Sequence, residues 1–110
     1  KKLWSGLKDH FNKGTQISVT DVQERLLFRQ ALETLRCYEE GVLTSVRDAN
    51  IGSVFGLGFA PWAGGAIQYV NQYGVRKFYE RTQELATVYG VRFAPPAILA
   101  KQAESDEAFV

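Results

Sequence analysis

Glycines and aromatic residues concentrate between residues 52 and 65, which read Gly-Ser-Val-Phe-Gly-Leu-Gly-Phe-Ala-Pro-Trp-Ala-Gly-Gly. Gly56 and Gly58 could open a dinucleotide-binding turn, in which glycines let a pyrophosphate approach the backbone. That motif requires a third glycine where this chain has Pro61, and a preceding strand that no alternating pattern predicts. No Lys-Ser or Lys-Thr pair follows to complete a phosphate-binding loop. We therefore expect these glycines to serve packing rather than nucleotide binding.

Few residues are available for metal or nucleophilic chemistry. His10 is the only histidine and Cys37 the only cysteine, so a site built from several imidazoles or thiolates is excluded. The carboxylates do not gather in one loop, as a site for a hard cation would require. Cys37 falls on or beside the apolar stripe of a predicted helix, where an unreactive buried thiol is common. Glu39 and Glu40 are neighbours that point in different directions, so we expect exposed charges rather than an acid–base pair. We predict no catalytic, cofactor-binding or metal-binding residue in this chain.

Basic residues repeat along one predicted helix. Arg25, Arg29 and Arg36 share a face, and a phosphate or phosphopantetheine group would suit them as a ligand. Glu33 lies among them at helical spacing, which favours a solvated face with ion pairs. The net charge of the whole chain is +1, which creates no overall attraction to nucleic acid or to an anionic membrane. We expect neither as a partner.

The elements that must position these residues are helices. Thr20 with Gln23 three residues later predicts a capping box, and Gly41 ends the helix that it opens. Ser45 with Asp48 predicts the start of a second helix. Two more helices are expected over residues 66–73 and 75–89, each followed by a glycine. A last helix is expected over residues 97–103, after a proline pair.

This pattern predicts an all-α fold, a compact bundle of about five helices in a single domain over residues 20–110. Residues 1–19 are expected to be a lead segment, where Leu3, Trp4, Leu7 and Phe11 have the spacing of a short helix. The acidic end, residues 105–110, is expected to be frayed. Glycines and a proline interrupt the longest apolar stretch, so no membrane span is predicted.

Three runs of the sequence resemble one family: residues 24–28 (Glu-Arg-Leu-Leu-Phe), 36–43 and 47–65. They are similar to the carboxy-terminal domain of 3-hydroxyacyl-CoA dehydrogenases, and above all to its second copy in multifunctional enoyl-CoA hydratase/3-hydroxyacyl-CoA dehydrogenase chains of fatty-acid β-oxidation. The resemblance covers about residues 21–109 and is most specific in the glycine-rich block. It implies a fold like that of the 6-phosphogluconate dehydrogenase carboxy-terminal domain.

The resemblance also implies that the chemistry belongs to another domain. In that family NAD and a catalytic His–Glu pair lie in a separate Rossmann domain, so this chain is expected to bind no cofactor and to be inactive alone. The first helical copy supplies an active-site asparagine from an Asn-Arg-Leu-Leu motif, where this chain has Glu24. A carboxylate cannot donate the amide hydrogen bond, so that role is not expected of Glu24. Whether Arg25, Arg29 and Arg36 touch the coenzyme A of an acyl-CoA substrate stays open.

The role implied is structural, with neighbouring helical and Rossmann domains of the parent chain as partners. Glycines one helical turn apart would let another helix approach closely, and the residues expected to pack between domains are Gly52, Gly56, Phe59, Pro61, Trp62, Gly64 and Gly65. The alternative is a free-standing helical interaction module, which an upstream strand–GxGxxG–helix unit in the same reading frame would exclude. A homodimer of the isolated domain stays open. The expected compartment is the bacterial cytoplasm, or a peroxisome or mitochondrion in a eukaryote.

Overall fold

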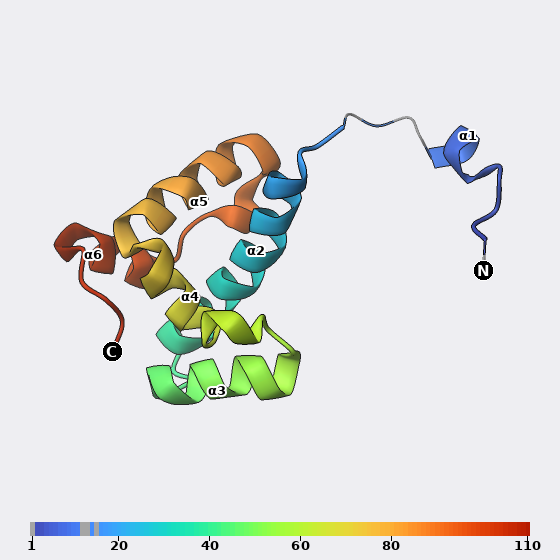
Figure 1. Ribbon diagram of the computed structural model, residues 1–110. Helices are drawn as coiled ribbons and strands as arrows, with labels where there is room; N and C mark the ends of the chain where they lie inside the picture. The colour runs from blue at the N-terminus through green and yellow to red at the C-terminus, as the bar shows by residue number, and fades with distance from the viewer. Residues whose placement is uncertain (1, 12–13, 15) are drawn as a thin grey trace.

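Six α-helices and two 3₁₀ turns make up the part of the chain that the computed structural model describes, residues 2–11, 14 and 16–110 (Figure 1). No strand occurs among these residues, so the prediction of an all-α bundle is confirmed. In chain order the elements are α1 (Leu7–Phe11), α2 (Val19–Glu39), α3 (Val46–Leu57), η1 (Pro61–Ala63), α4 (Ala66–Tyr73), α5 (Val75–Tyr89), η2 (Val91–Phe93) and α6 (Ala97–Ser105).

Capping interactions set most of the helix ends. Ser18 opens α2 by accepting a hydrogen bond from the Asp21 backbone N–H (3.2 Å), so the expected cap at Thr20 is wrong. Ser18 is extended while Thr20 already lies inside the helix, and a cap residue must be non-helical. The predicted cap of α3 is confirmed, since the Ser45 hydroxyl accepts from the Asp48 N–H (3.0 Å). Gly41 follows α2 with φ +79°, as predicted for a left-handed end.

The core lies where α2, α4, α5 and α6 meet. Phe28 of α2 is fully buried, its ring stacked on Phe78 of α5 with centroids 4.2 Å apart. Tyr73 of α4 meets the same Phe28 ring edge-on at 5.1 Å. Leucine, isoleucine and valine side chains fill the remaining volume, namely Leu32, Leu35, Ile67, Val70, Leu85 and Leu99. α4 packs against α2, α3 and α5, so it joins α3 to the rest of the bundle.

The acidic carboxyl end is ordered against α4, and the prediction of a frayed tail is wrong. Phe109 is only 6 % exposed. Its backbone N–H donates to Asn71 Oδ1 (2.8 Å), and its carbonyl accepts from Asn71 Nδ2 (2.9 Å). Asp106, at φ 55°, turns the chain after α6, and its carboxylate accepts from the Arg76 backbone N–H (3.1 Å). The side chain of Asn71 thus anchors the carboxyl end, which its acidic composition had predicted to be frayed.

α6 is held at both ends by side chains from other helices. The Glu39 carboxylate accepts from the Ile98 backbone N–H (2.7 Å), so Glu39 is a helix cap and not merely an exposed charge. At the other end the Arg76 guanidinium donates to the carbonyls of Ala103 (3.3 Å) and Glu104 (3.2 Å). Pro96 is the residue before the helix, and the helix continues two residues beyond the predicted end at Ala103.

The lead segment contains the short helix α1, which has no buried residue. Leu3 and Trp4 precede this helix, so the predicted helical spacing holds only from Leu7 to Phe11. Residues 1, 12, 13 and 15 of the predicted lead lie outside the described residues. Figure 1 draws α1 away from the other helices, and the division at residues 19 and 20 stays a prediction.

Candidate docking surface on helix α3

The glycine-rich block is built around a side-chain cap for α4. Asn50 Oδ1 accepts from the backbone N–H groups of Ile67 (3.0 Å) and Gln68 (2.9 Å). The Ser53 hydroxyl accepts from the Ala66 N–H (2.9 Å) and donates to the Asn50 carbonyl (2.9 Å). Both residues come from α3, so the two helices are joined by polar contacts that the helix start requires. No local pattern predicts this capping role, because the amides of α4 lie more than ten residues from Asn50 and Ser53.

This cap explains why the glycines do not create an anion site. A helix N-terminus binds phosphate through free backbone N–H groups. At α4 the N–H groups of Ala66, Ile67 and Gln68 already donate to α3. The next amide, that of Tyr69, bonds within the turn to the Gly65 carbonyl (2.9 Å). The expectation that the block serves packing agrees with this geometry.

The seven residues expected between domains divide into two groups. Phe59 is 2 % exposed and packs on Ala63 and Ala66, and Gly65 is buried against Asn50, so these two lie within the chain's own core. The other five are exposed: Gly52, Gly56, Pro61, Trp62 and Gly64. A Cβ atom added to Gly52 or Gly56 would meet nothing within 4 Å among the described atoms. No helix within this described part approaches them.

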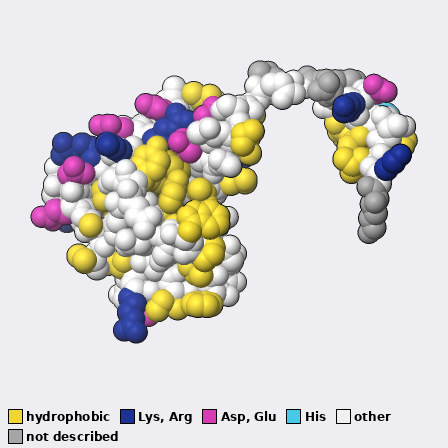
Figure 2. Space-filling model, viewed as in Figure 1, with side chains coloured by type: hydrophobic (Ala, Val, Ile, Leu, Met, Phe, Trp, Pro, Cys, Tyr) yellow, Lys and Arg dark blue, Asp and Glu magenta, His cyan; other side chains and the backbone are white. Residues whose placement is uncertain are grey.

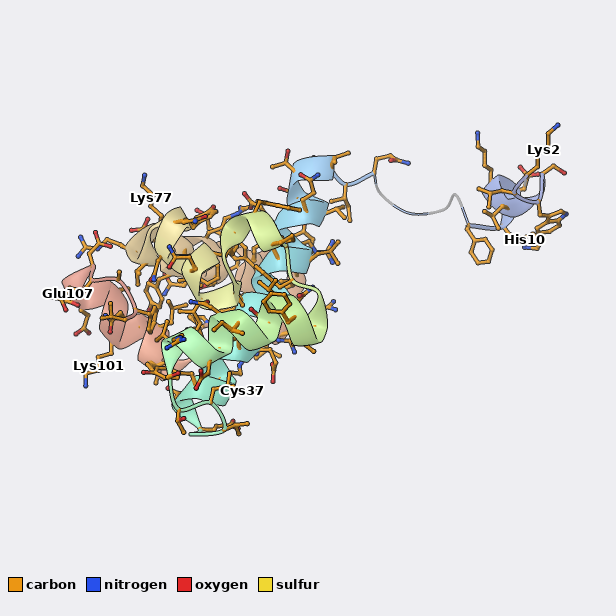
Figure 3. The ribbon with its side chains drawn as sticks, turned by 60° about the horizontal axis from the view of Figure 1, so that its bottom comes forward. Lys2, His10, Cys37, Lys77, Lys101 and Glu107 are labelled. Atoms are coloured by element: carbon orange, nitrogen blue, oxygen red, sulfur yellow. The ribbon has the colours of Figure 1, made fainter. Side chains whose placement is uncertain are left out.

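Gly52 and Gly56 instead line a groove between α2 and α3. It encloses about 600 Å³ and is mainly apolar, with small residues along its floor. The α3 side consists of Ala49, Gly52, Ser53, Gly56 and Leu57, and the remaining lining is Arg29, Gln30, Glu33, Thr34, Cys37, Val42 and Leu43. Cys37 is half-buried, so its thiol lines this groove instead of being sealed in the core. Figure 3, with the bottom of the molecule turned forward, shows Cys37 near the end of α2 beside α3.

Three large apolar side chains of α3 and η1 point into solvent, and one of them, Leu57, lines the groove. Phe55 is 86 % exposed, Leu57 77 % and Trp62 83 %. In Figure 2 hydrophobic side chains reach the surface over α3, at the bottom of the view. Burying one aromatic side chain removes roughly 150–250 Å² from water at about 25 cal/mol per Å². Exposed apolar side chains of this size, together with an apolar groove, are typical of a surface that another protein segment covers. We call the groove and these three residues the α3 surface.

Glu24 lies away from the α3 surface, in an ion-pair cluster that joins α2 to α5. Its carboxylate accepts from Arg81 Nε (2.7 Å), while the same guanidinium reaches Asp21 (3.1 Å) and Glu84 (2.9 Å). Hydrogen bonds from Arg81 to Glu24 and then Glu84 raise the pKa of the guanidinium above its usual range, against a smaller effect of burial. Glu24 therefore has a structural partner within the chain.

The arginines on the other side of α2 are less solvated than the sequence suggested. The Arg25 guanidinium lies 3.9 Å from the centroid of the Tyr89 ring. Arg36 donates to the Ala94 carbonyl (2.8 Å), which fastens the segment after η2 to α2. Glu33 pairs with both Arg29 (3.1 Å) and Arg36 (3.0 Å), as its spacing predicted. The hydrogen bond from Arg36 is the main cause that holds the pKa of Glu33 below its ordinary value.

The raised pKa of Tyr69 makes the unfolding free energy of the domain depend on pH in the alkaline range. Burial raises the pKa of Tyr69 to about 12, with smaller contributions from Tyr73 and Glu24. In the unfolded chain a tyrosine ionises near pH ~10, so the unfolded state loses this proton first. The stabilisation from Tyr69 is therefore complete below about pH 10 and is lost as the pH rises through about 12. We expect Tyr69→Phe to flatten the alkaline decline of the unfolding free energy, measured with urea. An unchanged slope in this variant would contradict the assignment.

Two further findings concern metal binding and membrane crossing by the described residues. They contain no group of three or more His, Cys, Asp or Glu side chains placed to hold a metal ion. Among the helices of residues 2–11, 14 and 16–110, none is both long and apolar enough to cross a membrane.

The described residues thus define a small all-α domain with an uncovered apolar surface on α3. Over 81 residues, 74 % of this chain, the sequence is 37 % identical to the fatty acid oxidation complex subunit alpha of Vibrio parahaemolyticus serotype O3:K6 (strain RIMD 2210633). Those residues make up 12 % of that subunit, so the chain spans about an eighth of the length of the relative that it matches. No protein-family model matches the chain. The similarity relates this chain to one region of a fatty acid oxidation subunit.

Proposed function

We propose that this chain is a helical docking domain of a multifunctional fatty-acid β-oxidation enzyme. It would correspond to the second carboxy-terminal domain of the 3-hydroxyacyl-CoA dehydrogenase module. Its role is to stabilise the neighbouring helical domain, and through it the cleft that holds NAD and acyl-CoA. The compartment proposed with it is the bacterial cytoplasm, since the relative comes from a bacterium.

The observation that carries this proposal is the α3 surface. Glycine, alanine and serine residues of α3 line its groove, and residues this small let another backbone approach α3 closely. Its exposed Phe55 and Trp62 are of the aromatic type that, once buried, dominates protein interfaces. The relative is much longer than this chain, and in such a protein neighbouring domains are available as the partner.

The reaction proposed for the parent enzyme is reversible hydride transfer between the 3-hydroxyl carbon of an acyl-CoA and the nicotinamide of NAD. Within this chain Glu24 donates nothing to such a site, since its carboxylate accepts from Arg81 and has no proton to offer an oxyanion. The domain therefore acts through packing, and its substitutions should change the stability of the module before they change its chemistry.

Trp62→Ala tests the docking role in the full-length polypeptide that carries this domain. The side chain is 83 % exposed in the domain itself, so its loss should leave the isolated 110-residue chain as stable as before. In the full-length protein we expect about 2 kcal/mol of lost interdomain stabilisation, which is roughly a 30-fold weaker association. Hydrogen exchange at α3 reports the loss as faster exchange, and NAD-dependent oxidation of a 3-hydroxyacyl-CoA declines with it.

The matched control is Trp4→Ala, because Trp4 is the only other tryptophan and is 62 % exposed on the lead segment. It should leave α3 exchange and dehydrogenase activity unchanged. Equal protection of α3 in the isolated chain and in the full-length protein would contradict the docking role. A parent polypeptide without dehydrogenase activity, but with α3 protected, would contradict the enzyme assignment and leave docking intact.

A further inference from the structure

A second pocket, which we call the arginine pocket, lies on the other face of α2, beside η2. It encloses about 300 Å³ and is lined by Val22, Arg25, Leu26, Arg29, Arg92 and Phe93. Two of the arginines are one helical turn apart on α2, and the third comes from η2. It touches the α2–α3 groove only through Arg29, which lines both.

Two of the three guanidinium groups, those of Arg25 and Arg29, have a close partner within the chain. Arg25 lies 3.9 Å from the centroid of the Tyr89 ring, and Arg29 is bonded to Glu33 at 3.1 Å. Arg92 sits 5.9 Å from the centroid of Phe93, whose ring is 3 % exposed at the base of the pocket. Arg36 donates to the Arg92 carbonyl (3.4 Å) and ties η2 to α2. Arg25 and Arg29 therefore lose less side-chain entropy on binding than arginines without a partner would.

Positive charge collects here far beyond the chain average. Three arginines line the pocket, and Arg29 alone among them is paired with a carboxylate, that of Glu33, so no ion pair among the described residues offsets the positive charges of Arg25 and Arg92. The net charge of the whole chain is only +1. In the described part of the chain, Arg25 and Arg92 lie within ion-pair distance of no carboxylate. Gathering like charges is unfavourable unless an anion offsets them.

We propose that the arginine pocket binds a phosphate monoester that carries an apolar or aromatic body. Guanidinium forks match phosphate oxygens in a bidentate way, and a doubly charged phosphate offsets the charges of Arg25 and Arg92. Val22 is 41 % and Leu26 63 % exposed, so together with Phe93 they offer an apolar wall to the body of the ligand. This site shares only Arg29 with the α3 surface, so the docking role could fail while the pocket binds its ligand.

The test uses phenyl phosphate as the probe and a ¹⁵N-labelled sample of the 110-residue chain. An NMR titration at low salt should shift the signals of Arg25, Arg92 and Phe93. Phenyl phosphate should bind several-fold more tightly than inorganic phosphate, because its ring covers the apolar wall. Added salt should weaken both ligands, since the attraction is electrostatic.

Arg92→Gln should weaken phenyl phosphate about tenfold, the effect of losing one charge-assisted hydrogen bond. Arg25→Lys keeps the positive charge but loses the planar guanidinium that binds two phosphate oxygens, so it should also weaken phenyl phosphate binding. The matched control is Arg47→Gln, because Arg47 is exposed on α3 and lines neither pocket. Absence of shifts at millimolar phenyl phosphate, or equal affinity in the Arg92 and Arg47 variants, would overturn the proposal. Benzoate or inorganic phosphate binding as tightly as phenyl phosphate would overturn the ligand class.

Discussion

Gly65→Ala is expected to lower the free energy of unfolding of this domain by about 3 kcal/mol or more. Gly65 has φ +120°, a conformation in which an alanine is strained. An added Cβ would lie 2.5 Å from Asn50 Cα and 2.7 Å from Asn50 Oδ1. Relief requires Asn50 to move, and Asn50 is the cap of α4. The strain and the lost cap therefore add, and urea unfolding followed by circular dichroism measures their sum.

Gly56→Ala is the matched control, with the opposite sign. Gly56 lies within α3, has no positive φ, and faces open space. Alanine there reduces the freedom of the unfolded chain and should stabilise the isolated domain by roughly 0.5–1 kcal/mol. A Gly65→Ala variant within about 1 kcal/mol of the wild type would show that Asn50 yields easily, contrary to the tight contact between α3 and α4.

Phe28→Ala is expected to cost about 3–5 kcal/mol, a large part of the net stability of a domain of this size. Phe28 is fully buried, and its ring contacts Phe78 of α5 as well as Tyr69 and Tyr73 of α4. Its removal leaves a cavity at the point where three helices meet, and rigid neighbours cannot close it. The loss should appear as a lower urea midpoint, or as a chain that no longer unfolds cooperatively.

Phe55→Ala provides the comparison, because it removes the same atoms from a side chain that is 86 % exposed. It should change the unfolding free energy of the isolated domain by less than about 0.5 kcal/mol. In the full-length polypeptide the same variant should weaken docking of α3, as Trp62→Ala does. Similar losses for both phenylalanines in the isolated chain would mean that the α3 surface is covered within the domain, and would contradict the docking role.

Where the determinants are local, the sequence predicts the fold well. Gly41, Gly74 and Gly90 follow their helices with positive φ, because only glycine takes that conformation without strain. Ser45 caps α3 through the backbone amide three residues later, which a short side chain with an acceptor oxygen can reach. The cap of α2 was misplaced because Ser18 and Thr20 have the same chemistry, and the backbone outside the helix decides between them.

The other differences from the sequence-based expectations share one physical cause, which is the sequence separation of the partners. The carboxyl end is ordered by Asn71, 38 residues before Phe109, and an acidic composition contains no sign of that pair. Glu39 caps α6 across 59 residues, and Glu24 meets Arg81 across 57. A hydrogen-bonding side chain on a helix surface has many possible partners, and the packing of the helices determines which one it contacts.

For the candidate site, sequence alone determined that α3 and the following turn carry unusual glycines and aromatic residues, and that no metal or nucleotide motif is complete. The tertiary structure decided which of them face outward. Phe59 and Gly65 close the chain's own core, while Gly52, Gly56 and Trp62 stay exposed. The difference arises because Asn50 and Ser53 hold the start of α4 against α3, which buries Gly65 beside Asn50, whereas a Cβ atom at Gly52 or Gly56 would meet nothing within 4 Å among the described atoms.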